Sequence, residues 1–322
     1  MLTEPLLTIH NLRTYYRVLR GYVKAVDGVD LYVKDGEALG LAGESGCGKT
    51  TIALSILRIL PQGGFIAGGN IMFREVDLAK IDEYEMKKKY RWKKISIVFQ
   101  GAMNALNPVY KISDQIVEAI TFHEPETTRA EALERAQKLF ELVGMEPSRI
   151  YGYPHEFSGG MRQRAMIAMA LACNPKLVIA DEPGTALDVI VQAQVLKLMK
   201  ELKEKLNLSI IMITHDLSII AETCNRVAIM YAGKIVETGD AATIFKEPLH
   251  PYTQGLVGAF PDIKAPRTRM VSIPGSPPDL LQPPSGCRFY PRCKYATAIC
   301  RKKEPVNIEV GKEHFVACHL IS

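Results

Sequence analysis

A glycine-rich segment with one lysine predicts a phosphate-binding loop near the start of the chain. Residues 43–50 read GESGCGKT and fit the pattern G-x-x-x-x-G-K-[ST]. An apolar stretch at 38–42 precedes the segment and a helix is expected over 51–60, which is the strand–loop–helix context that this motif needs. Glycines allow backbone N–H groups to face a phosphate, Lys49 adds a positive charge, and the hydroxyl of Thr50 suits Mg²⁺. The alternative, a glycine-rich turn without function, does not explain Lys49. The residues expected to surround the phosphates are Gly43, Glu44, Ser45, Gly46, Cys47, Gly48, Lys49, Thr50 and Thr51.

Two consecutive carboxylates follow an apolar run later in the chain. Residues 177–180 predict a buried parallel strand that delivers Asp181 and Glu182 to the C-terminal edge of a sheet. Asp181 would hold the magnesium shell, and Glu182 would polarise an attacking water, because phosphoryl transfer depends on positioning and charge neutralisation. His215 ends another predicted strand, 208–214, and can donate a hydrogen bond to the γ-phosphate. A structural role is the alternative for a single histidine at a strand end.

The segment between these motifs resembles the signature of ABC-type ATPases. Residues 158–161 read Ser-Gly-Gly-Met, and an apolar helix is expected over 165–173. A serine and two glycines that open a helix form a second anion-binding N-terminus. In that family two nucleotide-binding domains sandwich ATP head to tail. The resemblance therefore implies contact with a partner chain's nucleotide by Ser158, Gly159, Gly160 and Met161.

The resemblance covers nearly the whole chain and implies further roles. Gln100 matches the family's Q-loop, and residues 185–188 match its D-loop, which ends at Asp188. An aromatic side chain upstream of the loop is expected to stack on adenine, and Tyr16 is the favoured residue, with Tyr15 and Tyr22 as alternatives. The other interpretation is that these tyrosines only pack within a β-rich subdomain. The implied enzyme is an ATPase that couples hydrolysis to solute import, with ATP and Mg²⁺ as cofactors. Its implied catalytic residues are Lys49, Glu182 and His215, and its implied magnesium ligands are Thr50, Gln100 and Asp181.

Composition agrees with an α/β protein. The 322 residues are enough for one large core and a smaller appendage, and 47% hydrophobic with 23% charged residues is ordinary for a globular chain. No stretch is long and apolar enough to span a bilayer, and the N-terminus does not resemble a signal peptide, so we expect a chain that is cytosolic or sits on the cytoplasmic face of the membrane. The family resemblance implies the second location, as a peripheral protein. A net charge of +5 is too small to indicate a nucleic-acid partner, and the basic run at 87–94 is expected to be a solvated helix face.

The motifs also predict the domain organisation. We expect an ABC-type P-loop ATPase core over residues 1–240, with a β-rich N-terminal subdomain and a helical subdomain at about 101–172. A Pro-rich connection at 241–286 and a small Cys-rich C-terminal module at 287–322 follow. Within the core, Thr128 and Glu131 predict a helix capping box, and residues 227–237 predict a hairpin.

Four of the seven cysteines lie in the C-terminal module. Successive members are separated by five, six and seventeen residues, without the paired C-x₂-C spacing that favours zinc, and a cytosolic compartment disfavours disulfides. Four thiolates suit a [4Fe–4S] cluster. Zinc, with His314 or His319 as substitute ligands, and metal-free thiols are the alternatives. The predicted cluster ligands are Cys287, Cys293, Cys300 and Cys318, with charge offset by Arg288, Arg292, Arg301, Lys302 and Lys303.

The tail and the signature together resemble one subfamily. HPYTQGL at 250–256 and the Cys-rich module resemble the C-terminal extension of ATPases from dipeptide and oligopeptide ABC importers, some of which bind a [4Fe–4S] cluster there. GGMRQRAMIAMAL at 159–171 is similar to the "D" ATPase of the pair. The implied partners are an "F"-type second ATPase, two membrane permease subunits and an extracytoplasmic solute-binding protein. Import of oligosaccharides is the alternative function; a ribosome- or DNA-associated ABC ATPase is disfavoured because the chain has one cassette and no coiled-coil insertion.

Overall fold

The structure is a computed structural model that describes residues 4–101, 105–185, 187–259 and 273–321. The chain divides into two compact units: the first comprises residues 1–79 and 213–322, and the second comprises residues 80–212. Among the described residues, no helix is both long and apolar enough to cross a membrane.

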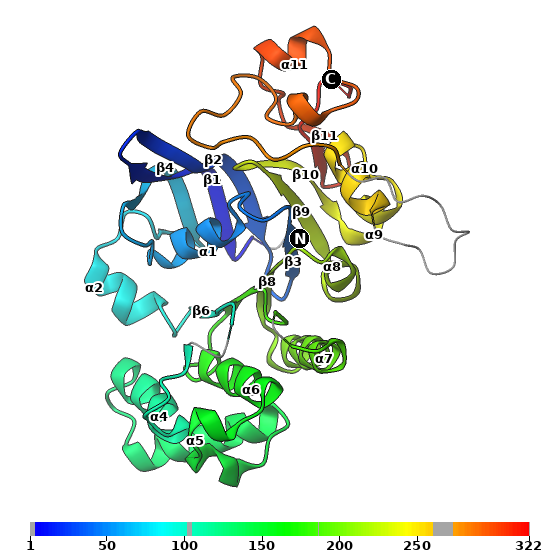
Figure 1. Ribbon diagram of the computed structural model, residues 1–322. Helices are drawn as coiled ribbons and strands as arrows, with labels where there is room; N and C mark the ends of the chain where they lie inside the picture. Colours follow the sequence, from blue (N-terminus) through cyan, green and yellow to red (C-terminus); the bar gives the residue numbers. More distant parts are fainter. Residues whose placement is uncertain (1–3, 102–104, 186, 260–272, 322) are drawn as a thin grey trace. The chain divides into compact units, whose positions relative to one another are not determined.

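An antiparallel sheet of four strands opens the first unit, in the order β2-β1-β4-β5 (Figure 1). Alternating residues of β1 are buried, among them Leu7 and Ile9, as expected for a strand with one face on a core. Leu7 lies opposite Val33 of β2 and Phe73 of β4, which fixes the register of the three long strands. The β-rich N-terminal region predicted from the sequence is therefore present. The strands are β1 (Leu7–Val18), β2 (Gly21–Val33), β4 (Gly64–Phe73) and β5 (Val76–Asp77).

A second group of strands in the first unit has the order β11-β12-β10-β9-β3. β3 and β9 run parallel and are buried along their whole length, whereas β9 and β10 form the predicted hairpin. Ala232 and Gly233 turn this hairpin with φ of 47° and 83°, the left-handed geometry of a tight two-residue turn. The strands are β3 (Ala38–Ala42), β9 (Arg226–Tyr231), β10 (Lys234–Asp240), β11 (Ile308–Gly311) and β12 (His314–Val316).

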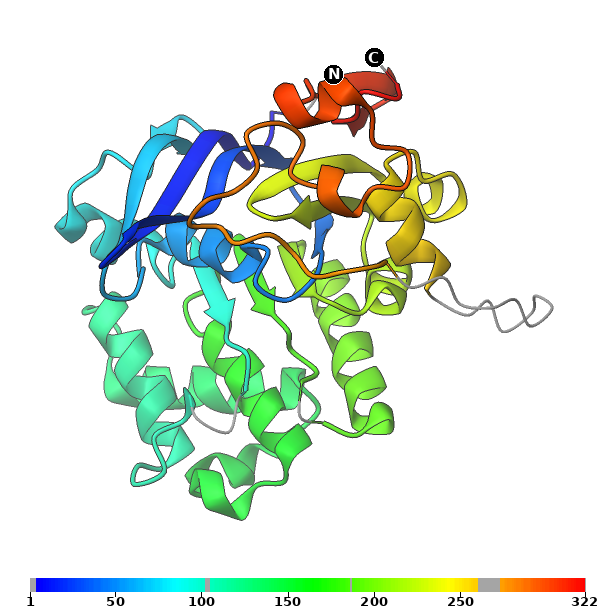
Figure 2. The same cartoon turned by 45° about the horizontal axis from the view of Figure 1, so that its top comes forward.

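The C-terminal residues of the first unit pack onto its core. Phe289 joins the buried cluster that contains Tyr231 and Tyr252, with ring centroids 5.1 and 5.4 Å from theirs. Figure 2 shows residues 273–286 running from α10 toward the β1–β2 hairpin, where the carbonyl of Leu280 accepts a hydrogen bond from the N–H of Lys24 (2.9 Å). The helices of the first unit are α1 (Lys49–Leu57), α8 (Leu217–Thr223), α9 (Ala241–Lys246), α10 (Pro251–Gly258), η4 (Tyr290–Arg292) and α11 (Ala298–Lys302).

The second unit is mainly helical and contains the parallel pair β6 and β7. The capping box is confirmed: the Thr128 hydroxyl accepts from the N–H of Glu131, whose carboxylate accepts from the N–H of Thr128. The helix expected over 165–173 begins earlier, because Ser158 caps it. The elements are α2 (Glu83–Glu85), η1 (Met86–Tyr90), β6 (Ile95–Val98), α4 (Ile112–His123), α5 (Arg129–Leu142), η2 (Pro147–Tyr151), η3 (Pro154–Glu156), α6 (Gly159–Ala170), β7 (Leu177–Asp181) and α7 (Val189–Leu206); β8 (Ser209–Thr214) crosses from this unit into the first.

Candidate functional site

The predicted phosphate loop connects β3 to α1 in the first unit, as the sequence indicates. Its three glycines have positive φ angles: 151° at Gly43, 77° at Gly46 and 111° at Gly48. A Cβ on Gly43 would lie 2.1 Å from the carbonyl oxygen of Met230, and one on Gly48 would lie 2.1 Å from that of Ala25. Glycine is therefore required at both positions by space as well as by backbone conformation.

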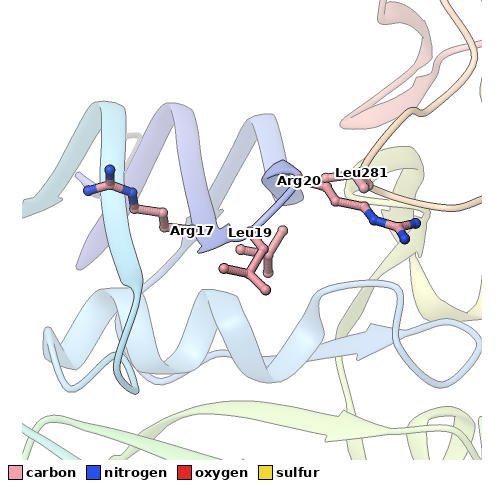
Figure 3. A pocket seen from close by; sticks show the side chains of 5 residues that line it. Arg17, Leu19, Arg20 and Leu281 are labelled. Atoms are coloured by element: carbon pink, nitrogen blue, oxygen red, sulfur yellow. The ribbon is translucent and has the colours of Figure 1, made fainter.

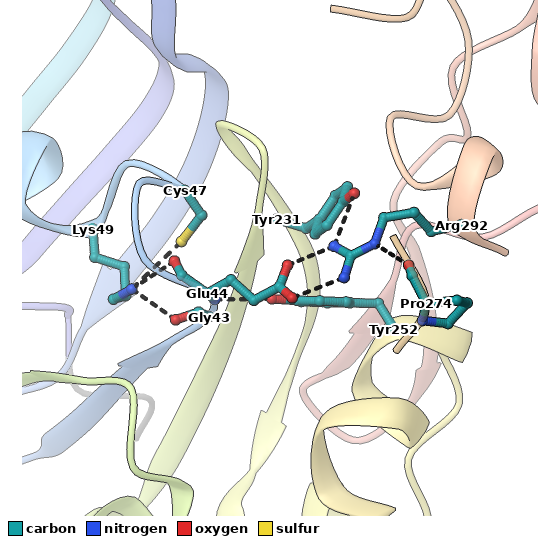
Figure 4. A network of polar contacts seen from close by, with 8 residues as sticks. All are labelled: Gly43, Glu44, Cys47, Lys49, Tyr231, Tyr252, Pro274 and Arg292. Atoms are coloured by element: carbon teal, nitrogen blue, oxygen red, sulfur yellow. Dashed lines mark hydrogen bonds and ion pairs between the residues drawn. The ribbon is translucent and has the colours of Figure 1, made fainter. Parts of the chain in front are cut away.

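The Lys49 side chain is buried against the backbone of the predicted phosphate loop. Its Nζ donates to the carbonyls of Gly43 (2.7 Å) and Glu44 (3.0 Å) and approaches Sγ of Cys47 at 3.6 Å (Figure 4). Burial raises the pKa of the Cys47 thiol. The thiol therefore stays protonated and places no negative charge beside Lys49. The neighbouring Thr50 is exposed, so its hydroxyl is accessible to a hydrated cation.

The three candidate tyrosines differ in their contacts. The Tyr16 hydroxyl lies 3.2 Å from Oγ1 of Thr51, directly after the loop. Tyr15 instead donates to Asp27 (2.6 Å), and burial followed by this hydrogen bond raises its pKa to about 12. Tyr22 packs edge-on against Phe65 with centroids 5.6 Å apart. Of the three, Tyr16 is therefore the one with a hydrogen-bond contact to the segment 43–51.

An open hollow of about 840 Å³ lies next to Tyr16 along the chain, at the tip of the β1–β2 hairpin. Figure 3 shows Arg17, Leu19 and Arg20 of this tip together with Leu281 from the C-terminal segment. The hollow thus combines two cationic side chains with apolar ones.

The Glu44 side chain makes a contact that the sequence does not reveal. Its two carboxylate oxygens accept hydrogen bonds from Nη1 (2.6 Å) and Nη2 (2.9 Å) of Arg292, and its backbone N–H donates to the Tyr252 hydroxyl (2.9 Å). These hydrogen bonds to Glu44 raise the pKa of Arg292, which is permanently charged. Tyr252 belongs to the HPYTQGL segment that the sequence analysis singled out, but no sequence pattern predicts its contact with the loop.

In the second unit the two predicted carboxylates follow β7 as expected. Asp181 is buried at the end of the strand, while Glu182 has a φ of 46°, a left-handed conformation that is uncommon for this residue type. Oε2 of Glu182 accepts from Nε2 of Gln100 (2.7 Å) and from Oγ1 of Thr185 (2.9 Å). Gln100 and Glu182 are both candidates from the sequence, and the structure brings them together and adds Thr185 to their hydrogen-bonded group. His215 follows β8 in the first unit and is exposed.

The signature segment forms the N-terminus of α6. The Ser158 hydroxyl caps the helix by accepting from the N–H of Met161 (3.3 Å) and is exposed. A Cβ on Gly160 would lie 2.5 Å from Cγ1 of Val191, so glycine is needed for close packing against α7. Asp188 caps α7 by accepting from the N–H of Val191 (2.9 Å). Ala186, within the predicted D-loop, lies outside the described residues.

The cysteines that the structure describes in the C-terminal module are not arranged as a single-ion metal site. In the described ranges, 4–101, 105–185, 187–259 and 273–321, no group of three or more His, Cys, Asp or Glu side chains is placed to hold a metal ion. Burial, followed by weaker effects that include the charges of Cys300, Cys318 and Cys293, raises the pKa of Cys287 to about 11. The histidines considered for zinc have other contacts, because Nε2 of His314 lies 2.9 Å from Glu237 and Nε2 of His319 lies 2.9 Å from the carbonyl of Lys303.

Two of the cationic residues expected to offset a cluster charge are directed elsewhere. Arg288 donates to the Asp27 carboxylate and to the carbonyl of Ala232, while Arg292 pairs with Glu44. Proximity to the cysteines in sequence was therefore a poor guide to the partners of these arginines.

Comparison with known proteins places these motifs in a family. Residues 26–185 match the family described as "ABC transporter", and residues 236–300 match "Oligopeptide/dipeptide transporter, C-terminal region". The chain is 47% identical over 98% of its length to the "Probable peptide ABC transporter ATP-binding protein y4tR" of Sinorhizobium fredii, covering 95% of that protein. The chain belongs to the ATP-binding subunits of ABC transporters. As an ABC ATPase it binds and hydrolyses ATP, with Mg²⁺ as the associated cation.

Other relatives agree with this assignment. The "Oligopeptide transport ATP-binding protein OppD" of Bacillus subtilis is 46% identical, with 98% of this chain and 89% of that protein covered. The solved dimer of the ATP-binding cassette MJ0796, in a post-hydrolysis state bound to ADP and Pi, matches with a TM-score of 0.64 and 25% identity, covering 73% of this chain and 98% of that one. This ABC ATPase thus has the mixed α/β cassette fold that the sequence predicted.

Proposed function

We propose that this ABC ATPase powers the uptake of dipeptides and oligopeptides through a transporter that depends on a solute-binding protein. The observation that carries the proposal is the match of residues 236–300 to the C-terminal region of oligopeptide and dipeptide transporters. The names of relatives from Sinorhizobium fredii and Bacillus subtilis support the same substrate class. ATP hydrolysis itself follows from membership of the family and does not depend on the nature of the solute.

We propose the following roles at the nucleotide site. Residues 43–51 hold the phosphates, with Lys49 as their cationic partner, and Tyr16 stacks on the adenine. The buried position of Lys49 against two loop carbonyls and the contact of Tyr16 with Thr51 support these roles. Magnesium is held by Thr50, Gln100 and Asp181, whose hydroxyl, amide and carboxylate oxygens suit a hard cation.

For hydrolysis we propose that Glu182 polarises the attacking water and that His215 donates a hydrogen bond to the γ-phosphate. The hydrogen bonds from Gln100 and Thr185 fix the orientation of the Glu182 carboxylate, which supports its role as the positioned base. Exposure of His215 at the end of β8 is compatible with its proposed contact.

We propose that the chain works as a heterodimer with a second, "F"-type ATPase. The exposed Ser158 and the helix N-terminus behind it, residues 159–161, would bind the partner's nucleotide, and Asp188 would lie in the D-loop between the two chains. Two permease subunits and an extracytoplasmic binding protein complete the transporter, with this chain at the cytoplasmic face of the membrane. ATP binding closes the ATPase pair, and hydrolysis reopens it.

For the organisation of the chain we propose a nucleotide-binding domain at 1–240, a connection at 241–286 and a Cys-rich module at 287–322. Two helices, α9 and α10, occupy the start of the connection. We further propose that the module binds a [4Fe–4S] cluster through Cys287, Cys293, Cys300 and Cys318. The proposal is supported by the sequence, because four cysteines in one short segment match the number of thiolates that such a cluster takes.

The cluster proposal is tested by metal analysis of anaerobically purified protein. About four irons and four acid-labile sulfides per chain are expected, and both should fall sharply in Cys293→Ser. Cys224→Ser is the matched control because Cys224 is outside the proposed ligand set. Stoichiometric zinc or the absence of any metal would overturn the cluster while leaving the ATPase assignment intact.

The substrate proposal is tested with the purified transporter in lipid. ATP hydrolysis should be stimulated by the binding protein loaded with a peptide, and labelled peptide should accumulate in vesicles of the correct orientation. The binding protein loaded with a cello-oligosaccharide is the comparison. Stimulation by the oligosaccharide alone would contradict peptide transport.

A further inference from the structure

An arginine from the C-terminal module forms an ion pair with the phosphate loop. Arg292 and Glu44 are 248 positions apart in the chain, and both carboxylate oxygens of Glu44 are within 2.9 Å of the guanidinium. The Arg292 side chain is only 5% exposed, whereas that of Glu44 is 27% exposed. A bidentate pair between a buried guanidinium and a carboxylate is specific in geometry as well as in charge.

Further contacts fix the guanidinium in place. Its Nε donates to the carbonyl of Pro274 (2.8 Å), and Nη1 approaches the Tyr231 hydroxyl at 3.4 Å. The guanidinium also lies 5.7 Å from the centre of the Tyr231 ring. Tyr231 is itself 1% exposed, so Arg292 is held by rigid parts of the first unit and defines where the Glu44 carboxylate lies.

The ion pair directs the side-chain carboxylate of Glu44 away from the backbone carbonyl of the same residue. Figure 4 shows the backbone carbonyl of Glu44 turned toward Lys49, while the side chain extends away from Lys49 to Arg292. This separation matters because Glu44 is an acid within a loop that binds a highly charged triphosphate. A carboxylate released from Arg292 would be free to approach the phosphates, and its negative charge would oppose ATP binding.

We propose that Arg292 is a positioning residue for ATP binding, which holds the Glu44 carboxylate away from the phosphate cradle and neutralises its charge. The C-terminal module thereby acts directly on the nucleotide site of the same chain. This role concerns ATP affinity and is independent of which solute the transporter moves.

The local structure around Arg292 connects this pair to the cysteine segment. Arg292 ends the short helix η4, which is tied at both sides: the N–H of Tyr290 donates to the carbonyl of Cys287 (3.1 Å), and the N–H of Cys293 donates to that of Tyr290 (3.3 Å). The N–H of Cys287 in turn donates to the carbonyl of Cys300 (2.8 Å). The fold of the cysteine segment therefore determines where the guanidinium lies.

The proposal is tested by the affinity of the full-length chain for a fluorescent ATP analogue, mant-ATP, in the presence of Mg²⁺. Arg292→Gln should raise the Kd about tenfold, which corresponds to about 1.4 kcal/mol. In the double variant Arg292→Gln/Glu44→Gln the repulsive charge is also absent, so most of the lost affinity should return. Lys294→Gln is the charge-matched control, because Lys294 is an exposed cation two positions away whose Nζ lies over the Tyr295 ring.

The double variant separates charge positioning from a general loss of structure. If Arg292→Gln weakened binding through a folding defect, the weak binding would persist or worsen when Glu44 is also changed. If it weakened binding through the charge of a released Glu44 carboxylate, replacing Glu44 would restore the affinity. Steady-state hydrolysis provides a second readout, in which Arg292→Gln should raise KM for ATP and leave kcat within about twofold. The proposal is overturned if Arg292→Gln binds within twofold of wild type, if the double variant is as weak as the single one, or if Lys294→Gln weakens binding equally.

Discussion

Glu37→Gln should destabilise the first unit strongly, because it breaks a buried ion pair. Nη1 of Arg226 lies 3.0 and 3.3 Å from the Glu37 carboxylate oxygens, and both side chains are 6% exposed. At an effective dielectric constant of about 20, unit charges 3 Å apart attract by about 5 kcal/mol. The amide of glutamine and the Tyr32 ring, 3.9 Å from the guanidinium, retain part of this stabilisation.

We therefore expect the free energy of unfolding to fall by about 3 kcal/mol, the lower end of the range for breaking a buried pair. The assay is urea denaturation, with the midpoint compared at unchanged slope. Glu313→Gln is the matched control, because Glu313 pairs with Lys34 at 33% and 34% exposure and its loss should cost less than about 1 kcal/mol. Equal and small effects of both substitutions would refute the reasoning from burial.

Three further predictions concern the loop and its supports. Gly43→Ala should weaken Mg·ATP binding at least tenfold, because the new Cβ would lie 2.1 Å from the Met230 carbonyl oxygen; Gly68→Ala, whose Cβ would meet only Arg13 at 4.0 Å, should bind normally in the same titration. Tyr252→Phe should lower the free energy of unfolding by about 1–2 kcal/mol in urea denaturation, since the N–H of Glu44 loses its acceptor; an unchanged midpoint would contradict this. Burial lowers the pKa of His250 to about 3, so the unfolded chain, with an imidazole pKa of about 6.5, binds one more proton between these values. Stability should therefore fall by about 1.4 kcal/mol per pH unit as the pH drops below about 6.5, and this part of the dependence should disappear in His250→Asn, which retains a capping side chain.

Features defined by short stretches of sequence were predicted well. The strand at 38–42, the loop that follows it and the helix after that loop are confirmed as structural elements, because their signals lie within about twenty consecutive residues. The capping box and the 227–237 hairpin are confirmed for the same reason. Element ends were less accurate: the helix expected over 51–60 ends at Leu57, since Arg58 adopts a left-handed conformation with a φ of 53°.

Contacts between distant segments were not predictable from the sequence. Arg288 and Arg292 were interpreted by their proximity to cysteines, but their side chains reach Asp27 and Glu44. The direction of a side chain on a short helix such as η4 depends on how that helix packs, which no local pattern encodes. The packing of Gly184 is a further contact of this kind, because a Cβ there would lie 2.6 Å from Cγ of Gln192 in the following helix.

The roles proposed for Lys49 and Glu182 are the central claim, and a paired measurement of Mg·ATP binding and turnover tests them most directly. Both are measured on the assembled transporter carrying wild-type chain, Lys49→Ala or Glu182→Gln. Lys49→Ala should lose binding, because the buried cation of the loop is removed. Glu182→Gln should bind ATP and hydrolyse it at least about 100-fold more slowly, because the positioned carboxylate is lost. Rapid turnover by Glu182→Gln, or unchanged binding by Lys49→Ala, would contradict the account.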